Sequence, residues 1–143
     1  MAATKKSEKP KALLCGMLET GGNILFLKRK GKDGKEGIEM PCVMGSTTTD
    51  PMGQLSEAFK KQTGIAAHPV HIVMEGRHNV GTAKSPEYVP VIVYEMENDE
   101  PLIAPEPGKG YSGFVKMPLL KAKEARLSEN ASWMLEEGVM VDG

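Results

Sequence analysis

The sequence predicts an α/β (α+β) domain, a sandwich in which helices cover a mixed central sheet. Three observations support this fold class. Apolar and β-branched runs of strand length recur along the chain, one well-capped helix separates the early runs from the later ones, and a second helical region follows near the C-terminus. The order strand, strand, short strand, helix, strands, helix is typical of a mixed sheet with two main helices.

Composition favours one ordinary globular domain. The chain has 143 residues, of which 40% are apolar and 26% charged, and a net charge of −1. This charge gives no global field that would attract nucleic acid or an anionic membrane, and no apolar run reaches the roughly 18–20 residues of a membrane span. We expect a flexible basic tail over residues 1–10, with a phosphate-binding arm as the minority alternative. The domain should cover residues 11–138, and residues 139–143 should form a C-terminal tail.

The N-terminus and the cysteines together indicate a cytoplasmic protein. The basic start of the chain is not followed by the apolar core of a signal peptide. Cys15 and Cys42 are too few for a disulfide scaffold, lack CxxC spacing and lie in apolar runs, so we interpret them as buried thiols in a reducing compartment. A redox pair is the alternative interpretation.

The first part of the chain contains strand and turn signals in close succession. Ala12–Leu18 is an apolar run of strand length, and Glu19–Asn23 is rich in turn residues. Ile24–Leu27 is then a second strand, so the pattern predicts a hairpin around the Gly-Gly-Asn turn. Gly31–Gly37 is a polar, glycine-rich loop, and Ile38–Met44 is a short apolar stretch.

The helix signal is strong over Pro51–Thr63. Asp50 can cap its first turn, and proline is well placed at the first helical position because its missing N–H would be unpaired there. Gly64 can end the helix, while Gly53 weakens its first turn slightly. One apolar stripe should face the core, formed by Met52, Leu55 and Phe59.

The second half of the chain contains further strands and a final helix. We expect strands at Val70–Glu75, Tyr88–Met96 and Gly113–Val115, separated by a polar loop from His78 to Glu87 and an irregular, proline-rich segment from Pro101 to Gly110. A helical stretch should begin at Met117–Leu120. The last helix should run from Ser128, a plausible cap, to Glu137, with Trp133 and Met134 facing the core.

The segment from Ile24 to Ile65 resembles the Nudix hydrolase family. The strand end Leu25–Lys30, the approach Glu39-Met40-Pro41, the apolar helix position Phe59 and the closing pair Gly64-Ile65 all match in register. The family signature is G-x5-E-x7-R-E-U-x-E-E-x-G-U, where U is bulky and apolar. The resemblance implies an α/β/α sandwich and an activity on nucleoside-diphosphate derivatives that depends on Mg²⁺ or Mn²⁺.

The acidic residues of that signature are absent. Val43 stands where the family has its first glycine, and Thr49 stands at the first glutamate. The arginine position holds Glu57, and the remaining glutamate positions hold Ala58, Lys61 and Gln62. Magnesium and manganese need oxygen ligands, mostly carboxylates, and Lys61 would repel them. We therefore expect no metal cofactor at this helix.

Basic residues near the degenerate motif are the candidates for ligand binding. An ammonium at Lys61 could take the place of the metal and hold a phosphate, with Lys60, Lys28 and Arg29 nearby, although charge runs are more often solvated helix faces. Thr49, in the loop Gly45–Thr49 before the helix, is a weaker candidate, since a polar loop explains that segment as well.

Three functions remain open from the sequence. The first is a Nudix-like protein that binds a nucleotide or other phosphorylated small molecule, or acts as a regulatory module, without hydrolysis. The second is an active hydrolase of phosphoanhydride bonds with relocated metal ligands, whose candidate catalytic residues are Glu57, Glu75, Glu87 and Glu106. The third is a structural or partner-binding domain with no small-molecule site, which should have an open or filled cleft and an apolar surface patch.

The histidines and methionines give no independent functional signal. His68 and His71 are three residues apart on one expected strand and should point to opposite faces, so they and His78 form no metal spacing. The 10 methionines are interpreted as fillers of a core poor in aromatic residues.

Overall fold

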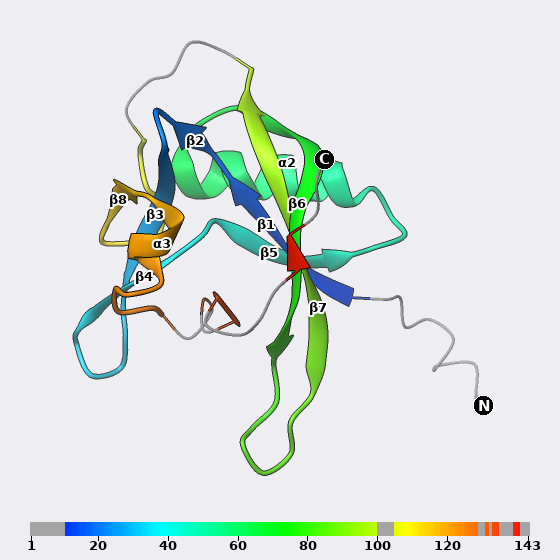
Figure 1. Cartoon of the computed structure of the whole chain (residues 1–143), viewed down its shortest axis with the longest axis vertical. Helices are drawn as coiled ribbons and strands as arrows, with labels where there is room; N and C mark the ends of the chain where they lie inside the picture. Colours follow the sequence, from blue (N-terminus) through cyan, green and yellow to red (C-terminus); the bar gives the residue numbers. More distant parts are fainter. Residues whose placement is uncertain (1–10, 100–104, 129–130, 132, 135–138, 141–143) are drawn as a thin grey trace.

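Two β-sheets and the helix α2 (Pro51–Thr63) form the layers of the molecule (Figure 1). The structure is a computed structural model that describes residues 11–99, 105–128, 131, 133–134 and 139–140. The other elements are β1 (Lys11–Met17), β2 (Glu19–Thr20), β3 (Asn23–Lys30), β4 (Glu36–Glu39), β5 (Cys42–Ser46), β6 (Ala67–Asn79), β7 (Tyr88–Asn98), β8 (Gly113–Met117), the short helix α3 (Leu119–Ala122) and β9 (Val139–Met140).

The larger sheet is mixed, as the sequence predicts. Its strand order is β5-β1-β7-β6-β9, in which β1 and β7 are parallel and the other pairs antiparallel. In the smaller sheet β3 pairs antiparallel with β2, β4 and β8. The fold is therefore mixed α/β with two helices among the described residues, which confirms the predicted fold class.

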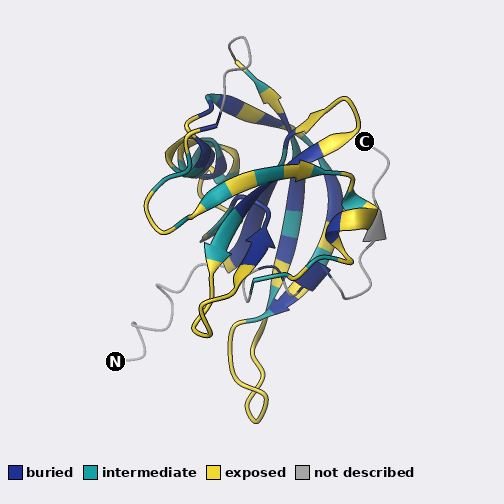
Figure 2. Ribbon diagram, turned by 90° about the vertical axis from the view of Figure 1, so that its left-hand side faces the viewer, coloured by how far each residue is buried: buried dark blue, intermediate teal, exposed yellow. Residues whose placement is uncertain are grey.

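Strand β1 lies between two apolar cores and is buried on both faces. Figure 2 shows buried residues running along the strands at the centre of the molecule. Ala12 and Leu14 pack in the core that contains Phe59 of α2, whereas Leu13 and Cys15 pack in the core that contains β3, β4 and β8. Successive side chains of a strand point to opposite faces, so a strand covered on both sides reads as a continuous apolar run. This explains the run from Ala12 to Leu18.

Gly16 is required where α2 packs on this sheet. A Cβ atom at this position would lie 2.8 Å from Cδ2 of Phe59 and 2.9 Å from Cγ of Met96. These distances are well inside van der Waals contact, so the helix approaches the sheet closely only because this residue has no side chain.

Helix α2 has the bounds and both ends that the sequence predicts. The Asp50 side chain accepts a hydrogen bond from the Gly53 backbone N–H at 3.2 Å, and Gly64 ends the helix in the left-handed region with φ 77°. A Cβ at Gly53 would lie 2.1 Å from the capping carboxylate, so this glycine makes room for the cap. Leu55 and Phe59 are buried, but Met52 is 43% exposed, and its predicted place in the core is wrong.

Two glutamines of α2 close the outer edge of strand β5. The Gln62 side chain accepts a hydrogen bond from the Cys42 backbone N–H at 3.2 Å and donates one to the Cys42 carbonyl at 2.7 Å. The Gln54 side chain accepts one from the Ser46 backbone N–H at 3.2 Å and donates to the carbonyl of Thr49. Unpaired groups on an edge strand can pair with another chain, so these amides protect the edge.

The predicted hairpin forms, but between different strands from those expected. The turn lies at Gly21 and Gly22, both with positive φ, but it joins β2 to β3 within the smaller sheet. Strand β1 instead pairs with β5 and β7 in the larger sheet, and the Leu25 N–H donates to the Leu18 carbonyl where the chain passes between the two sheets. Local turn signals do not determine which sheet a strand joins.

A β-bulge corrects the prediction for the two early histidines. The β6–β7 register shifts between Pro69 and His71, so that His68 pairs with Glu97 and His71 with Glu95. Glu95 and Glu97 are two positions apart on β7, so their side chains point to the same face of the sheet. The bulge therefore places their partners, His68 and His71, on that face as well. His68 also contacts Asp99, and His71 Nε2 lies 3.9 Å from the Glu95 carboxylate.

The C-terminal part also differs from the expectation. The Ser128 hydroxyl donates to Glu39 rather than capping a helix, and Ala131, Trp133 and Met134 are buried in 3₁₀-helical geometry. The other residues predicted in the last helix, 129–130, 132 and 135–137, lie outside the described residues. Val139 and Met140, assigned to a tail from the sequence, form β9 and pair with β6.

The N-terminal tail predicted at residues 1–10 lies outside the described residues, as do residues 101–104 of the irregular segment. No described helix is both long enough and apolar enough to cross a membrane.

Replacing Gln62 by alanine should lower the free energy of unfolding by about 1–3 kcal/mol, because the N–H and C=O of Cys42 would lose their partners. Gln62→Glu should also destabilise the protein, since a carboxylate cannot donate to the Cys42 carbonyl. Urea unfolding measures both. Glu57→Ala, an exposed change on the same helix, is the matched control and should stay within about 0.5 kcal/mol. Equal stabilities of the Gln62 and Glu57 variants would contradict this account of the edge.

Candidate functional site

The C-terminal end of α2 packs against the loop at residues 105–112, which precedes β8. The Glu106 N–H donates to the Thr63 carbonyl at 2.8 Å, and the Gly108 N–H donates to the Gln62 carbonyl at 2.9 Å. A Cβ at Gly108 would lie 2.5 Å from the Lys61 carbonyl oxygen. The loop thus uses its glycine to approach the helix end and satisfies backbone carbonyls that a helix leaves without partners.

A pocket opens between this helix end and this loop. Its volume is about 470 Å³, and it is lined by Lys61, Gln62, Gly108, Lys109 and Tyr111, which we call the lysine pocket. Two of these residues are cationic, one is an amide and one is a phenol, and none carries a carboxylate. A pocket with this lining favours an anionic ligand.

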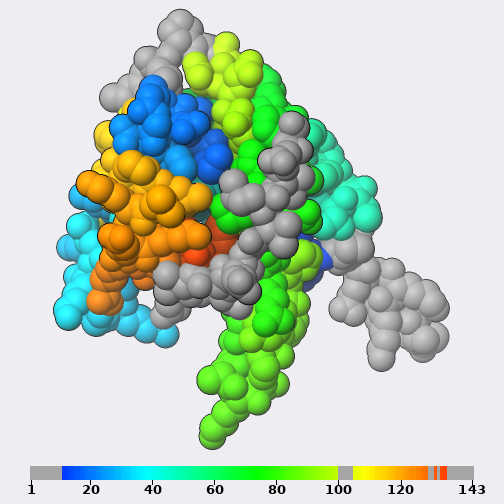
Figure 3. Space-filling view, in the orientation of Figure 1, coloured from blue at the N-terminus to red at the C-terminus, as the bar shows by residue number. Residues whose placement is uncertain are grey.

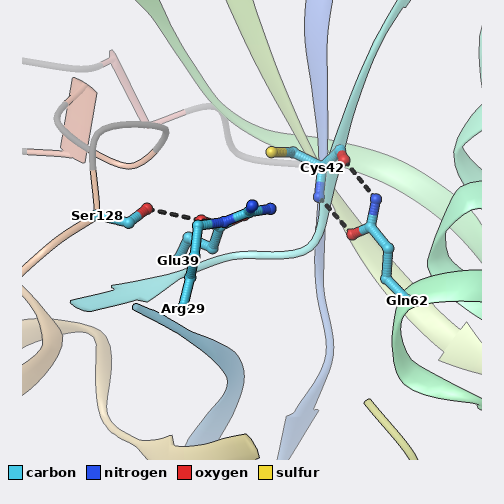
Figure 4. Close-up of polar contacts among 5 residues, drawn as sticks. All are labelled: Arg29, Glu39, Cys42, Gln62 and Ser128. Carbon is cyan, nitrogen blue, oxygen red and sulfur yellow. Dashed lines mark hydrogen bonds and ion pairs between the residues drawn. The ribbon is translucent and has the colours of Figure 1, made fainter. Parts of the chain in front are cut away.

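A partly buried ion pair joins Arg29 to Glu39 (Figure 4). The Arg29 Nε donates to Glu39 Oε1 at 2.9 Å, and the Ser128 hydroxyl donates to the same oxygen at 2.7 Å. Glu39 is 1% exposed, so its charge needs these partners. The β3–β4 register, which pairs Leu27 with Glu39 and Arg29 with Gly37, brings the two charged residues close together.

Tyr111 connects this ion pair to the lysine pocket. The Arg29 guanidinium lies 4.7 Å from the centre of the Tyr111 ring. Burial, and then the negative charge of Glu39, raise the pKa of Tyr111, so its hydroxyl stays protonated at neutral pH. The hydrogen bond to Glu39 raises the pKa of Arg29, which keeps its charge. Tyr111 therefore presents a neutral aromatic ring to the pocket.

The predicted ligand-binding residues do not all come together. Lys61 lines the pocket, and Lys60 is exposed beside it on α2. Lys28 is half-buried on β3, and its carbonyl accepts a hydrogen bond from the Ser112 N–H. The Arg29 side chain forms an ion pair with Glu39. Thr49 precedes the opposite end of α2: from Pro51 to Lys61 the helix rises about 15 Å. Thr49 and Lys61 therefore do not form one site.

The candidate carboxylates are dispersed. Glu57 is exposed in the middle of α2, Glu75 is exposed on β6, Glu87 ends the β6–β7 loop, and Glu106 packs beside Gly64 at the pocket end of α2. Within the described part of the chain, no group of three or more His, Cys, Asp or Glu side chains is arranged to hold a metal ion.

Sequence reasoning missed four of the five residues that line the pocket: Gln62, Gly108, Lys109 and Tyr111. The motif comparison treats Gln62 only as a lost glutamate, whereas its amide binds the β5 backbone. Lys109 and Tyr111 belong to a loop without periodicity, for which the sequence predicts only irregular structure. The glycines on both sides of Lys109 are the one local signal of a loop that approaches another backbone closely.

No family model matches the sequence, and a search of curated proteins finds no match. Solved structures do match. The E. coli ORF135 protein superposes with a TM-score of 0.67 at 14% identity, over 91% of this chain and 89% of that chain. A Nudix hydrolase from Nitrosomonas europaea gives 0.63 at 11% identity, over 90% and 87%. An ADP-ribose pyrophosphatase from Streptococcus suis gives 0.62 at 12% identity, over 90% and 87%.

These structural matches cover about nine tenths of the chain, at identities that establish architecture alone. Together with the degenerate motif in register along α2, they identify the architecture: the chain has the Nudix hydrolase fold.

Proposed function

We propose that the protein binds a phosphorylated small molecule of the nucleoside-diphosphate class in the lysine pocket, and that it does so without metal-dependent hydrolysis. The observation that carries the proposal is the pocket lining, which combines Lys61 and Lys109 with Tyr111 and no carboxylate. The structurally similar protein from Streptococcus suis is an ADP-ribose pyrophosphatase, so a nucleotide derivative suits the fold as well as the charge.

The chemistry of the pocket supports an anionic ligand. Lysine ammonium groups bind phosphate as point charges, each with three donors. A phosphate at about 4 Å from one ammonium gains roughly 1 kcal/mol in water and up to about 4 kcal/mol in a less polar environment. Because Lys61 and Lys109 are both exposed, the lower end of this range applies to each of them. Tyr111 adds an aromatic face for the uncharged part of the ligand.

The residues of α2 do not fit the metal that the fold family implies. At the positions of the family glutamates this helix carries Ala58, which has no ligand atom, Lys61, which is cationic, and Gln62, whose amide is engaged by Cys42. Hard divalent cations require several oxygen ligands, and a neighbouring ammonium opposes them. This helix therefore offers no ligand set for a metal-dependent hydrolytic step.

The pocket also bears on the alternative of a purely structural domain. A cleft closed by side chains beside Lys28 and Lys61 would favour that alternative, whereas a space of about 470 Å³ lies beside Lys61. This volume falls within the range of about 300–1,000 Å³ typical of small-molecule sites. A binding role, including a regulatory role in which ligand occupancy is the signal, is therefore the better supported function.

A cytoplasmic location is part of the same proposal. Cys15 and Cys42 are free thiols, which suits a reducing compartment.

Lys61→Glu and Lys109→Glu should each weaken the binding of ADP-ribose or ADP by about tenfold or more, because each replaces an attraction with a repulsion worth about 1.4 kcal/mol or more in total. Isothermal titration calorimetry measures the dissociation constants. The matched control is Lys84→Glu, the same charge change in the β6–β7 loop, which projects away from the body of the molecule (Figure 3). It should bind like the wild type.

If none of these ligands binds, or if all three variants bind alike, the lysine pocket is not the site. Inorganic pyrophosphate in a parallel titration separates recognition of the phosphates from recognition of the nucleoside, because only the phosphate part can contact the lysines.

No metal-dependent turnover is expected when the protein is incubated with ADP-ribose, nucleoside diphosphate sugars and dinucleoside polyphosphates in Mg²⁺ or Mn²⁺, because α2 lacks the carboxylate ligands. Phosphate or nucleotide release, followed by chromatography, measures this, with an active Nudix hydrolase as the positive control. Metal-dependent product formation that an alanine change at Glu57, Glu75, Glu87 or Glu106 abolishes would instead support the hydrolase with relocated ligands.

A further inference from the structure

The two cysteines lie directly opposite each other on neighbouring strands. In the antiparallel β1–β5 ladder Cys15 pairs with Cys42. The Gly16 N–H donates to the Pro41 carbonyl at 2.9 Å, so the adjacent position in the ladder is a hydrogen-bonded pair. Pairs alternate along an antiparallel ladder, which makes Cys15 and Cys42 a non-hydrogen-bonded pair.

The N–H and C=O groups of Cys42 point away from β1, and this independently supports the assignment as a non-hydrogen-bonded pair. Both groups bind the Gln62 side chain on the far side of β5, as expected where backbone groups point away from the paired strand. Non-hydrogen-bonded pairs bring their Cα atoms to about 4.5 Å. A disulfide needs Cα atoms about 4.4–6.8 Å apart, so the strands already have a spacing that a disulfide can bridge.

The side chains are directed accordingly. Cys15 lies in the core between the two sheets and Cys42 packs against the same core, so the two thiols lie on the same side of the β1–β5 ladder. The Cys42 sulfur points toward the side of Glu39, away from Gln62 (Figure 4). The sulfur atoms are thus neighbours on one face of the sheet, although the two residues lie far apart in the sequence.

The two thiols differ in access. Cys15 is fully buried, and Cys42 is only half-buried at the edge strand. Burial, the Cys42 contact and the charge of Glu39 together raise the pKa of the Cys15 thiol, which disfavours its thiolate. Cys42 is therefore the thiol that a reagent from solvent can meet first.

We propose that Cys15 and Cys42 form a reversible dithiol–disulfide site whose oxidant is a low-molecular-weight disulfide of the glutathione class. The Cys42 thiolate attacks one sulfur of the oxidant, forms a mixed disulfide and releases one thiol. Cys15 then gives up its proton, attacks the Cys42 sulfur and releases the second thiol. The two cysteines are oxidised by two electrons, and the reagent disulfide is reduced to two thiols. This proposal does not depend on the ligand of the lysine pocket.

Incubation of the native full-length protein with oxidised glutathione tests the site. The wild type should lose both free thiols and two hydrogen atoms in mass, without a retained adduct, and peptide mapping should recover a Cys15–Cys42 cross-link. Dithiothreitol should restore both thiols. Retention of two free thiols, or a stable glutathione adduct in place of the cross-link, would overturn the proposal.

Single variants test the order of attack. Cys15→Ser should accumulate a stable glutathione adduct at Cys42, because the resolving thiol is missing, whereas Cys42→Ser should stay reduced, because Cys15 is buried. If Cys15→Ser fails to fold, Cys15→Ala places a smaller apolar side chain in the same core. Adduct formation at Cys15 in the Cys42→Ser variant, or no adduct at Cys42 in a folded Cys15 variant, would contradict Cys42 as the entry thiol.

Discussion

The hydrogen bonds between the Gln62 amide and the Cys42 backbone connect the parts of this molecule that matter for function. They join the end of α2 to the edge strand β5, and the carbonyl of Gln62 in turn accepts the N–H of Gly108. One residue therefore sets the distance between helix, edge strand and loop. The lysine pocket opens between the helix and the loop, and the pairing of Cys15 with Cys42 lies on the inner side of the edge strand.

The buried charge of Glu39 determines the role of Arg29 beside the lysine pocket. Because this carboxylate is almost fully buried, it requires Arg29, and the Arg29 guanidinium also lies over the Tyr111 ring. Arg29 is therefore a structural cation that fixes the wall of the pocket. The positive charge in the lining of the pocket comes from Lys61 on the helix and Lys109 on the loop.

The sequence predicted those parts of the fold whose signals are local. Asp50, Pro51 and Gly64 define the ends of α2 through their own backbone preferences, and the apolar run of β1 reflects burial on both faces. The division of strands into two sheets was not predictable, because the Gly21-Gly22 turn is compatible with either partner. The wrong prediction for Met52 has a similar cause. Helical periodicity predicts which face of α2 is apolar, but it does not predict how far along the helix the sheet covers that face.

The candidate site was predictable only where it lies on a periodic element. Lys61 was identified because the helix register placed it at a known position of the motif. Arg29 was assigned to the ligand because its partner, ten residues later, becomes visible only from the β3–β4 register. Lys109 and Tyr111 come from a loop whose position depends on two backbone bonds to the end of α2, and no local pattern encodes such bonds.

The features that this chain shares with the Nudix signature are those that shape the backbone. Pro41 is buried between β4 and β5, Phe59 fills the core, and Gly64 takes a left-handed conformation that other residues rarely adopt. Of the glutamate positions on α2, the one held by Lys61 is exposed and those held by Ala58 and Gln62 are half-buried. Gln62 gives the clearest case: an amide at a ligand position both donates to and accepts from the backbone of β5, which a carboxylate cannot do. The fold can therefore be retained with the metal ligands replaced, because at this position the replacement itself stabilises the packing of α2 against the sheet.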